Sequence, residues 1–141
     1  MGEKVLGGCA CGAVTYEVSA DPLIMLNCHC RDCQRATGSG FAPVVVYPRT
    51  SVRINGDLRY YRQVGEDGKA VERGFCLNCG NPIANRLERM PDVLGVIASS
   101  LADPSLHQPS IDMFSASAQA WDYLGPTTQK FERGPVGAGS T

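Results

Sequence analysis

All seven cysteines of the chain lie in three short clusters, and their spacing suits metal chemistry. A tetrahedral zinc ion with Zn–S bonds of ~2.3 Å places its sulfur ligands roughly 3.8 Å apart. Cysteines at positions i and i+3 of a tight turn can meet that distance, so the clusters predict metal binding. They are Cys9-Ala10-Cys11, Cys28-His29-Cys30-Arg31-Asp32-Cys33 and Cys76-Leu77-Asn78-Cys79-Gly80.

The first and last clusters together supply four thiolates, enough for a closed structural zinc site. In a strand, residues i and i+2 point to the same face, so Cys9 and Cys11 can hold one ion where the strand bends. The C-x-x-C turn of Cys76 and Cys79 is followed by Gly80, which can adopt a positive φ at little cost. That conformation folds the turn back and aims backbone amides at the sulfurs.

The middle cluster leaves three cysteines, Cys28, Cys30 and Cys33. Three protein ligands with an open fourth position are typical of a reactive zinc rather than a structural one. His29 lies between two of these cysteines, but strand alternation turns its side chain to the opposite face. We therefore expect three thiolate ligands and no histidine ligand in this site.

Other uses of the cysteines are less compatible with the sequence. Residues 1–5 contain no apolar stretch of signal-peptide length, so we expect a cytoplasmic location, where thiols stay reduced. An odd number of cysteines argues against a disulfide framework. A redox C-x-x-C ordinarily opens a helix, whereas Gly80-Asn81-Pro82 is typical of a turn. Iron–sulfur ligation by thiolates alone stays open, although the C-x-x-C-G turn favours zinc.

Composition excludes several classes of protein. Hydrophobic residues make up 43% of the chain and charged residues 19%, which fits a globular domain rather than a disordered chain. Apolar runs such as Val44-Val45-Val46 are far shorter than the ~18 residues that cross a membrane. The formal net charge is −1 and the basic residues are scattered, so we expect no nucleic-acid surface.

The elements that must position the cysteines are short strands. Asn55-Gly56 predicts a hairpin joining residues 51–54 to 57–61. One short helix is expected at residues 31–36, ending near Gly38. The pattern predicts a mainly β sandwich or barrel-like domain over residues 1–133, with very little helix and a disordered tail at 134–141. The other expected strands are residues 14–18, 41–47, 70–75, 83–87, 93–98 and 111–114.

The motifs in this order resemble one known family. They are Gly7-Gly8-Cys9-Ala10-Cys11-Gly12-Ala13-Val14-Thr15-Tyr16-Glu17, Cys28-His29-Cys30-Arg31-Asp32-Cys33-Gln34-Arg35-Ala36-Thr37-Gly38 and Phe75-Cys76-Leu77-Asn78-Cys79-Gly80. The family is that of the glutathione-dependent formaldehyde-activating enzymes (the GFA/CENP-V domain), and the resemblance runs from about residue 7 to about residue 124. It implies an Mss4-like fold of short antiparallel sheets and hairpins with zinc-binding loops.

The resemblance also implies two zinc ions per chain and a reaction. Cys9, Cys11, Cys76 and Cys79 would hold a structural zinc, and the other three cysteines would hold a catalytic zinc. The family's name activity condenses glutathione with formaldehyde to S-(hydroxymethyl)glutathione, and it is classed as a carbon–sulfur lyase for the reverse direction. The expected partners are thus a small thiol and a small aldehyde, and the residues specify no oligomeric state.

Polar side chains directly after the middle cluster are candidates for binding the peptide part of glutathione. Arg31, Gln34, Arg35 and Thr37 are these candidates, since arginine suits a carboxylate bidentately. The alternative is that they are ordinary solvated or capping residues. Trp121 and the five tyrosines are most simply interpreted as aromatics of the core or of strand faces.

Two functions remain in view. The leading one is a zinc-dependent carbon–sulfur enzyme acting on thiol adducts of formaldehyde or a similar aldehyde, because an incoming thiol is a natural fourth ligand for a three-thiolate zinc. The alternative is a non-catalytic zinc module that binds a thiol or a protein partner.

Overall fold

The computed structural model describes residues 4–134, and their fold is mainly β. They form eleven strands, one α-helix and four short 3₁₀-helices. Residues 135–141, most of the tail expected to be disordered, lie outside the described residues. The strands are β1 Val5–Gly8, β2 Thr15–Val18, β3 Ile24–Cys28, β4 Ala42–Pro48, β5 Val52–Asn55, β6 Leu58–Val64, β7 Ala70–Cys76, β8 Pro82–Leu87, β9 Val93–Ile97, β10 Ile111–Met113 and β11 Gln129–Lys130. The helices are α1 Arg31–Thr37 and the 3₁₀-helices Arg49–Ser51, Ala98–Ser100, Pro104–Leu106 and Ser115–Ser117.

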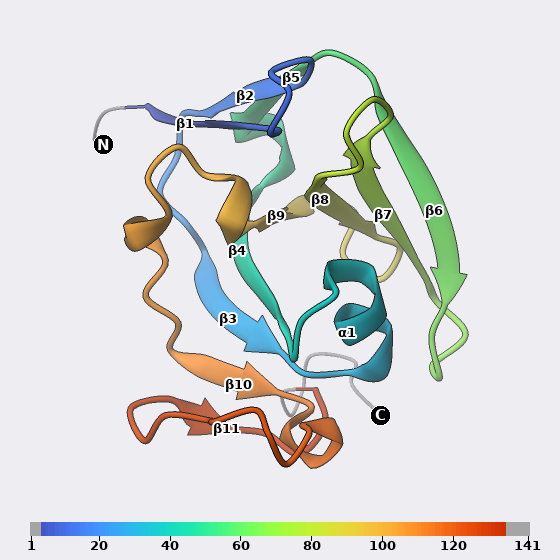
Figure 1. Ribbon diagram of the computed structural model, residues 1–141, viewed down its shortest axis with the longest axis vertical. Helices are drawn as coiled ribbons and strands as arrows, with labels where there is room; N and C mark the ends of the chain where they lie inside the picture. Colours follow the sequence, from blue (N-terminus) through green and yellow to red (C-terminus); the bar gives the residue numbers. More distant parts are fainter. Residues whose placement is uncertain (1–3, 135–141) are drawn as a thin grey trace.

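Two sheets make up the domain. A small antiparallel sheet has the order β1-β2-β5, and a larger one has the order β11-β10-β3-β4-β9-β8-β7-β6. Figure 1 shows the small sheet at one end of the molecule and β10 and β11 at the other. In the larger sheet only the β10 pairings, with β3 and with β11, are parallel. The prediction of a mainly β domain is confirmed.

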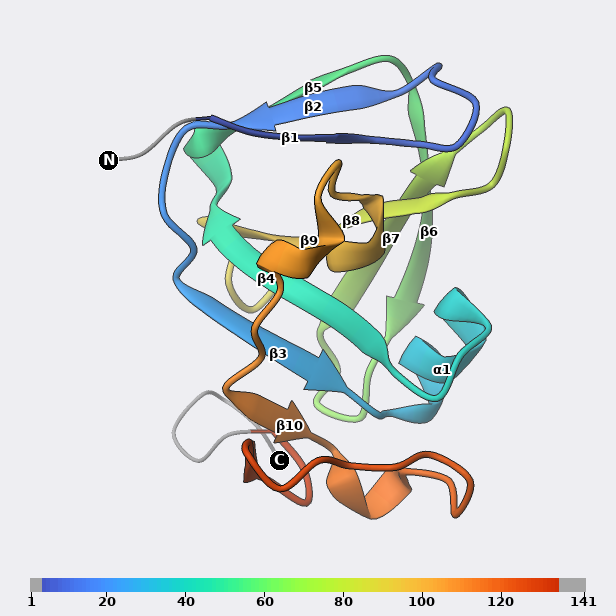
Figure 2. The same cartoon turned by 60° about the vertical axis from the view of Figure 1, so that its left-hand side comes forward.

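The main core lies between the small sheet and the middle of the larger one. Val14, directly before β2, and Tyr16 and Val18 within it, which alternation placed on one face, are all buried, at 0%, 3% and 1% exposure. They pack in one cluster with side chains of β4, β8 and β9, including Val45 and Ile83. In Figure 2 the small sheet with β2 lies at the top of the view, above β4 and β9. Period-two alternation therefore identified the inward face of this strand correctly.

The hairpin predicted at Asn55-Gly56 is wrong. β5 pairs with β2 in the small sheet, while β6 pairs with β7 at the edge of the larger sheet. Gly56 has φ 100°, and a Cβ there would collide with the carbonyl of Ala13. The glycine thus lets the chain pass close to the β1–β2 turn and change sheets, instead of folding back on itself.

The predicted short helix is confirmed as α1, and it begins and ends as its sequence indicates. Cys30 is the N-cap residue, and its sulfur accepts a hydrogen bond from the backbone N–H of Cys33 at 3.3 Å. Gly38 closes the helix in the left-handed conformation with φ 71°, and its N–H donates to the carbonyl of Gln34. The helix is therefore held at both ends directly after β3.

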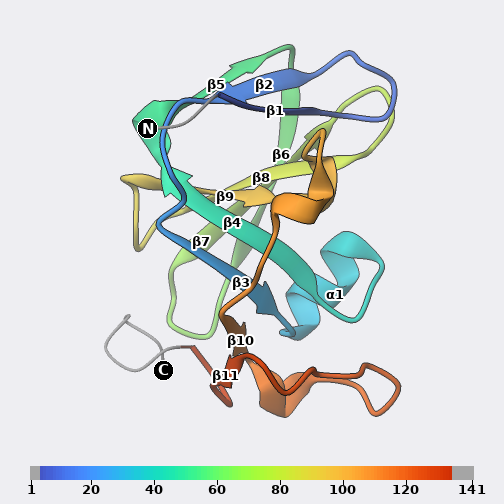
Figure 3. The ribbon, with the colours of Figure 1, turned by 90° about the vertical axis from the view of Figure 1, so that its left-hand side faces the viewer.

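The C-terminal segment, residues 111–134, begins with β10, which pairs with β3, and lies at the end of the molecule away from the small sheet, as Figure 3 shows. In it, the interpretation of Trp121 and Tyr123 as core or strand-face aromatics is wrong, because they are 72% and 84% exposed. Both lie in the loop before β11, outside any strand, so no sheet face covers them. Tyr16 and Tyr47, by contrast, are buried in the core.

Among the described residues, no helix is both long and apolar enough to cross a membrane.

Candidate metal centres

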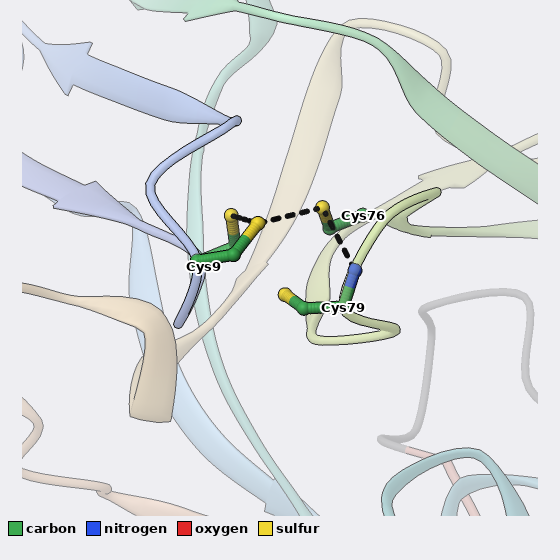
Figure 4. Close-up of side chains that lie close together, drawn as sticks. Cys9, Cys76 and Cys79 are labelled. Carbon is green, nitrogen blue, oxygen red and sulfur yellow. Dashed lines mark hydrogen bonds between the residues drawn. The ribbon is translucent and has the colours of Figure 1, made fainter.

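The first metal centre brings together Cys9, Cys11, Cys76 and Cys79, whose sulfurs all lie within 4.8 Å of one another. The sulfur of Cys11 is 3.6 Å from that of Cys9 and 3.7 Å from that of Cys76. These separations are close to the roughly 3.8 Å edge of a tetrahedral zinc–thiolate site. Figure 4 shows the side chains of Cys9, Cys76 and Cys79 converging on one space.

Two loops from different sheets supply these four thiols. The C-x-C pair was expected in a bent strand, but β1 ends at Gly8 and both cysteines lie in the turn between β1 and β2. The turn brings them together because the N–H of Gly12 donates to the carbonyl of Cys9 at 3.2 Å. The side-chain oxygen of Asn81 accepts from the N–H of Ala10 at 3.0 Å and ties the two loops together.

Backbone amides point at the sulfurs, as a thiolate site requires. Cys76 accepts from the N–H groups of Asn78 and Cys79 at 3.3 and 3.4 Å, and Cys9 accepts from Val14 at 3.2 Å. Gly80 has φ 78°, the positive value expected for it. Amide donors stabilise the anionic form of the ligands, so the local backbone fits a metal-bound thiolate.

The second metal centre contains Cys28, Cys30 and Cys33, again with all sulfurs within 4.8 Å of one another. Cys28 is the last residue of β3, Cys30 caps α1 and Cys33 lies in the first turn of that helix. Cys28 and Cys33 are 8% and 6% exposed and pack with Ala42 in a small apolar cluster of their own. A strand end and a helix start therefore bring three thiols to one point within six residues.

Without a metal these three thiols share protons unequally. Hydrogen bonds from Cys28 and Cys33 lower the pKa of Cys30 to about 2. The pKa of Cys28 is raised well above its usual value because its thiol donates to Cys30 and because it is buried. The pKa of Cys33 is raised to about 12, since hydrogen bonding to Cys30 and burial outweigh the lowering effect of Cys28. One thiolate and two thiols thus occupy the cluster at neutral pH.

Both donor sets fit zinc. Four thiolates complete a tetrahedral ion, and three thiolates leave one position for another ligand. Among the described residues these are the two groups of three or more potential ligand side chains that converge closely enough for one ion. His29 joins neither group, and its ring nitrogens lie 2.7 Å from carboxylate oxygens of Asp112 and Asp122.

A cavity of about 420 Å³ opens beside α1, between the helix and strands β6 to β8. Arg35, Thr37 and Asn85 line it together with Tyr61, Gln63 and Arg73. Cys33 lies two residues before Arg35 in the same helix, and no cysteine is among the residues lining the cavity. The cavity reaches the three-cysteine cluster through Arg73, which lines it and contacts Cys33, and it has room for a small molecule.

Arg73 links this cavity to the cysteines. Its Nη1 donates to the sulfur of Cys33 at 3.8 Å, and its Nε donates to Oε1 of Gln63 at 2.6 Å. The positive charge lowers the pKa of Cys30 and Cys33, as a secondary contribution. Arg73 stands in β7, 40 residues from Cys33, so no local pattern in the sequence pointed to it.

The four predicted substrate contacts divide into two pairs. Arg35 and Thr37 line the cavity. Arg31 donates to Oε1 of Gln34 at 2.6 Å and is not among the residues lining the cavity. Gln34 is 5% exposed and donates to the carbonyls of His29 and Ser117, so its amide is already engaged within the fold.

Comparison with known proteins points to one family. The family model for "Glutathione-dependent formaldehyde-activating enzyme" matches residues 4–117 of the chain. Among solved structures, the chain is similar to a Rhodobacter sphaeroides protein, a Northeast Structural Genomics target. The two are 25% identical with a TM-score of 0.58, and the match covers 74% of this chain and 96% of that one. No curated protein matches.

Proposed function

Because the chain belongs to the family of glutathione-dependent formaldehyde-activating enzymes, we propose that it is a zinc-dependent carbon–sulfur lyase-type enzyme. Its substrate would be the adduct of a thiol, glutathione or another, with formaldehyde or a similar small aldehyde. The observation that supports this proposal best is the three-thiol cluster beside a cavity large enough for a small molecule.

The reaction needs little from the protein besides charge and position. In the synthetic direction the thiol sulfur forms a bond to the aldehyde carbon, the carbonyl π bond becomes a C–O single bond, and the thiol proton ends on that oxygen. A zinc ion held by Cys28, Cys30 and Cys33 would supply a Lewis acid with one open position for sulfur or oxygen. The reverse reaction breaks the same carbon–sulfur bond.

Residues of this chain would hold the thiol in its reactive form. The guanidinium of Arg73 favours a thiolate over a thiol at the cluster, since it already donates to Cys33. Its hydrogen bond to Gln63 fixes the direction of that donor. Arg35 and Thr37 offer a cation and a hydroxyl on the helix side of the cavity for polar groups of the substrate.

Two-dimensional exchange NMR on glutathione and formaldehyde at equilibrium tests the proposal. The two compounds react unaided, so the observable is faster exchange between free glutathione and its hydroxymethyl adduct when the zinc-loaded protein is present. We expect acceleration with the wild-type protein and none with Cys30→Ser. A Ser39→Ala variant, changed just beyond α1 where no cysteine is affected, serves as the control and should retain activity.

Either of two results would contradict the proposal. One is no acceleration by wild-type protein carrying two zinc ions, which favours a binding role for the cluster. The other is full activity in Cys30→Ser, which would locate the reaction elsewhere in the molecule.

A further inference from the structure

His29 is fixed at every polar atom, although it is not a metal ligand. Its ring is 1% exposed, with Nδ1 2.7 Å from Oδ2 of Asp122 and Nε2 2.7 Å from Oδ1 of Asp112. Its backbone N–H donates to the carbonyl of Met113 at 2.9 Å, and its carbonyl accepts from Nε2 of Gln34 at 2.7 Å. No rotation of this residue is possible without breaking a buried hydrogen bond.

This fixed residue is the link between two cysteines of the cluster. Cys28 ends β3 and Cys30 caps α1, so the backbone torsions of His29 set the distance and direction between their thiols. A carboxylate oxygen lies within hydrogen-bond distance of each ring nitrogen, so the ring is held from both sides. Hydrogen bonds at both ring nitrogens in a buried site keep the ring in one orientation.

The two carboxylates are themselves held in place by the C-terminal segment. Oδ2 of Asp112 accepts from the hydroxyl of Thr128, and Nζ of Lys130 lies 3.7 Å from the same oxygen. Asp122 packs against Gly40, where an added Cβ would lie 2.9 Å from the carboxyl carbon. Neither acid depends on the histidine alone for its position.

Part of this arrangement lies outside the family match. The matched region ends at residue 117, whereas Asp122, Thr128 and Lys130 follow it. The position of His29 between the cysteines is therefore supported in part by residues beyond the matched region.

We propose that His29 is a positioning residue for the three-cysteine metal site and that the C-terminal segment acts on this site through Asp112 and Asp122. The segment fixes the separation of the Cys28 and Cys30 thiols before a metal ion binds. The metal site is therefore already formed in the metal-free protein. The inference rests on the proposed function in one respect, namely that this cluster binds zinc. Carboxylates and amides beyond the ligands of a metal are known to act in this way, and their loss costs about 10- to 100-fold in affinity.

Zinc competition with a chromophoric chelator tests the proposal on the full-length chain, because the two sites report separately. In Asp122→Ala we expect the zinc of the four-cysteine site to keep its wild-type affinity. The zinc of the three-cysteine site should bind about 10- to 100-fold more weakly. Asp122→Asn keeps an amide group that can hydrogen-bond with Nδ1, so most of the affinity should return. Glu66→Gln is the control, because it removes an exposed ion pair between the body of the domain and Arg133.

The outcomes separate the two proposals. Unchanged affinity at the three-cysteine site in folded Asp122→Ala overturns the positioning role and leaves the proposed function standing. Equal weakening of both sites, or an Asp122→Asn variant as weak as Asp122→Ala, also overturns it, because a general loss of stability would explain the result. If Asp122→Ala does not fold, Thr128→Val replaces it and should give a smaller, equally site-specific loss. A wild-type protein that binds only one zinc would defeat both proposals.

Discussion

The two cysteine sites are built in opposite ways from the same ligand. The four-cysteine site closes a long loop, joining the β1–β2 turn to the end of β7 across the two sheets, and Cys76 belongs to the main core. The three-cysteine site takes all its ligands from six consecutive residues and lies in a separate small cluster beside a cavity. A metal in the first site would hold distant parts of the chain together, whereas a metal in the second adds little to the fold. Under the proposed function, the first site would stabilise the domain and the second would be the reactive one.

Replacing Cys76 with serine should give the largest effect on stability. The change removes a ligand that is 1% exposed and leaves a hydroxyl in the main core. Loss of the metal together with this packing should cost about 4 kcal/mol or more of unfolding free energy. Thermal unfolding followed by circular dichroism measures it. The matched change Cys30→Ser should cost far less, and equal losses in the two variants would remove the distinction between the sites.

Lowering the pH should release zinc from the three-cysteine site steeply. Cys28 and Cys33 have raised pKa values, so in the metal-free protein both are protonated at neutral pH. Zinc binds the thiolates, and each ion bound must release two protons. Affinity should therefore fall about 100-fold for each pH unit lost. Calorimetric zinc titrations in buffers of different ionisation enthalpy count the protons released per zinc ion bound. Release of one proton or fewer would contradict the prediction.

Arg73→Gln should lower activity while leaving both metals bound. The variant loses the positive charge next to Cys33 and keeps a side chain that can reach Gln63. We expect kcat/KM for the thiol exchange to fall about 10-fold, the size of one charged hydrogen bond, with zinc content unchanged. The control is Arg59→Gln on the exposed face of β6. Equal activity in both variants would show that the charge of Arg73 plays no part.

Asn81→Ala should produce the smallest effect and confine it to the four-cysteine site. The change removes the hydrogen bond from Ala10 that ties the two metal-binding loops together. A single hydrogen bond of this kind contributes about 1 kcal/mol to stability. Urea unfolding measures the loss, with Asn78→Ala, an exposed change in the same turn, as the control. No difference between these two variants would mean that the metal alone joins the loops.

Local chemistry made much of the molecule predictable from the sequence. The Cys9–Cys11 pair, the Cys76–Cys79 turn, the three-cysteine cluster, the inward face of β2 and the helix ending at Gly38 each depend on residues within a few positions of one another. Such short-range patterns have a single structural solution, because turn geometry and strand alternation permit few others.

Long-range features were missed for the opposite reason. Asn55-Gly56 has the composition of a hairpin turn, but β5 and β6 on either side of it pair with strands of different sheets. This long-range pairing, rather than the local sequence, sets the conformation of the turn. Arg73, Asp112 and Asp122 reach the three-cysteine site through contacts between residues far apart in the sequence. No motif in the local sequence marks any of them. The prediction that Trp121 and Tyr123 are buried was wrong, because an aromatic residue is buried only where another part of the fold packs over it.

The parallel pairing of β10 with β3 has a consequence for how the chain reaches this structure. The residues it joins are far apart, with His29 and Asp112 separated by 83 positions, so this end of the large sheet is complete only after most of the chain is available. Long-range pairing of this kind is slow. A newly made chain carries seven free thiols, so zinc and oxidants compete for them until the metal sites form. The yield of correctly folded protein should therefore rise with the concentration of zinc supplied during synthesis. This rise should appear at zinc concentrations that do not change the properties of protein that has already folded.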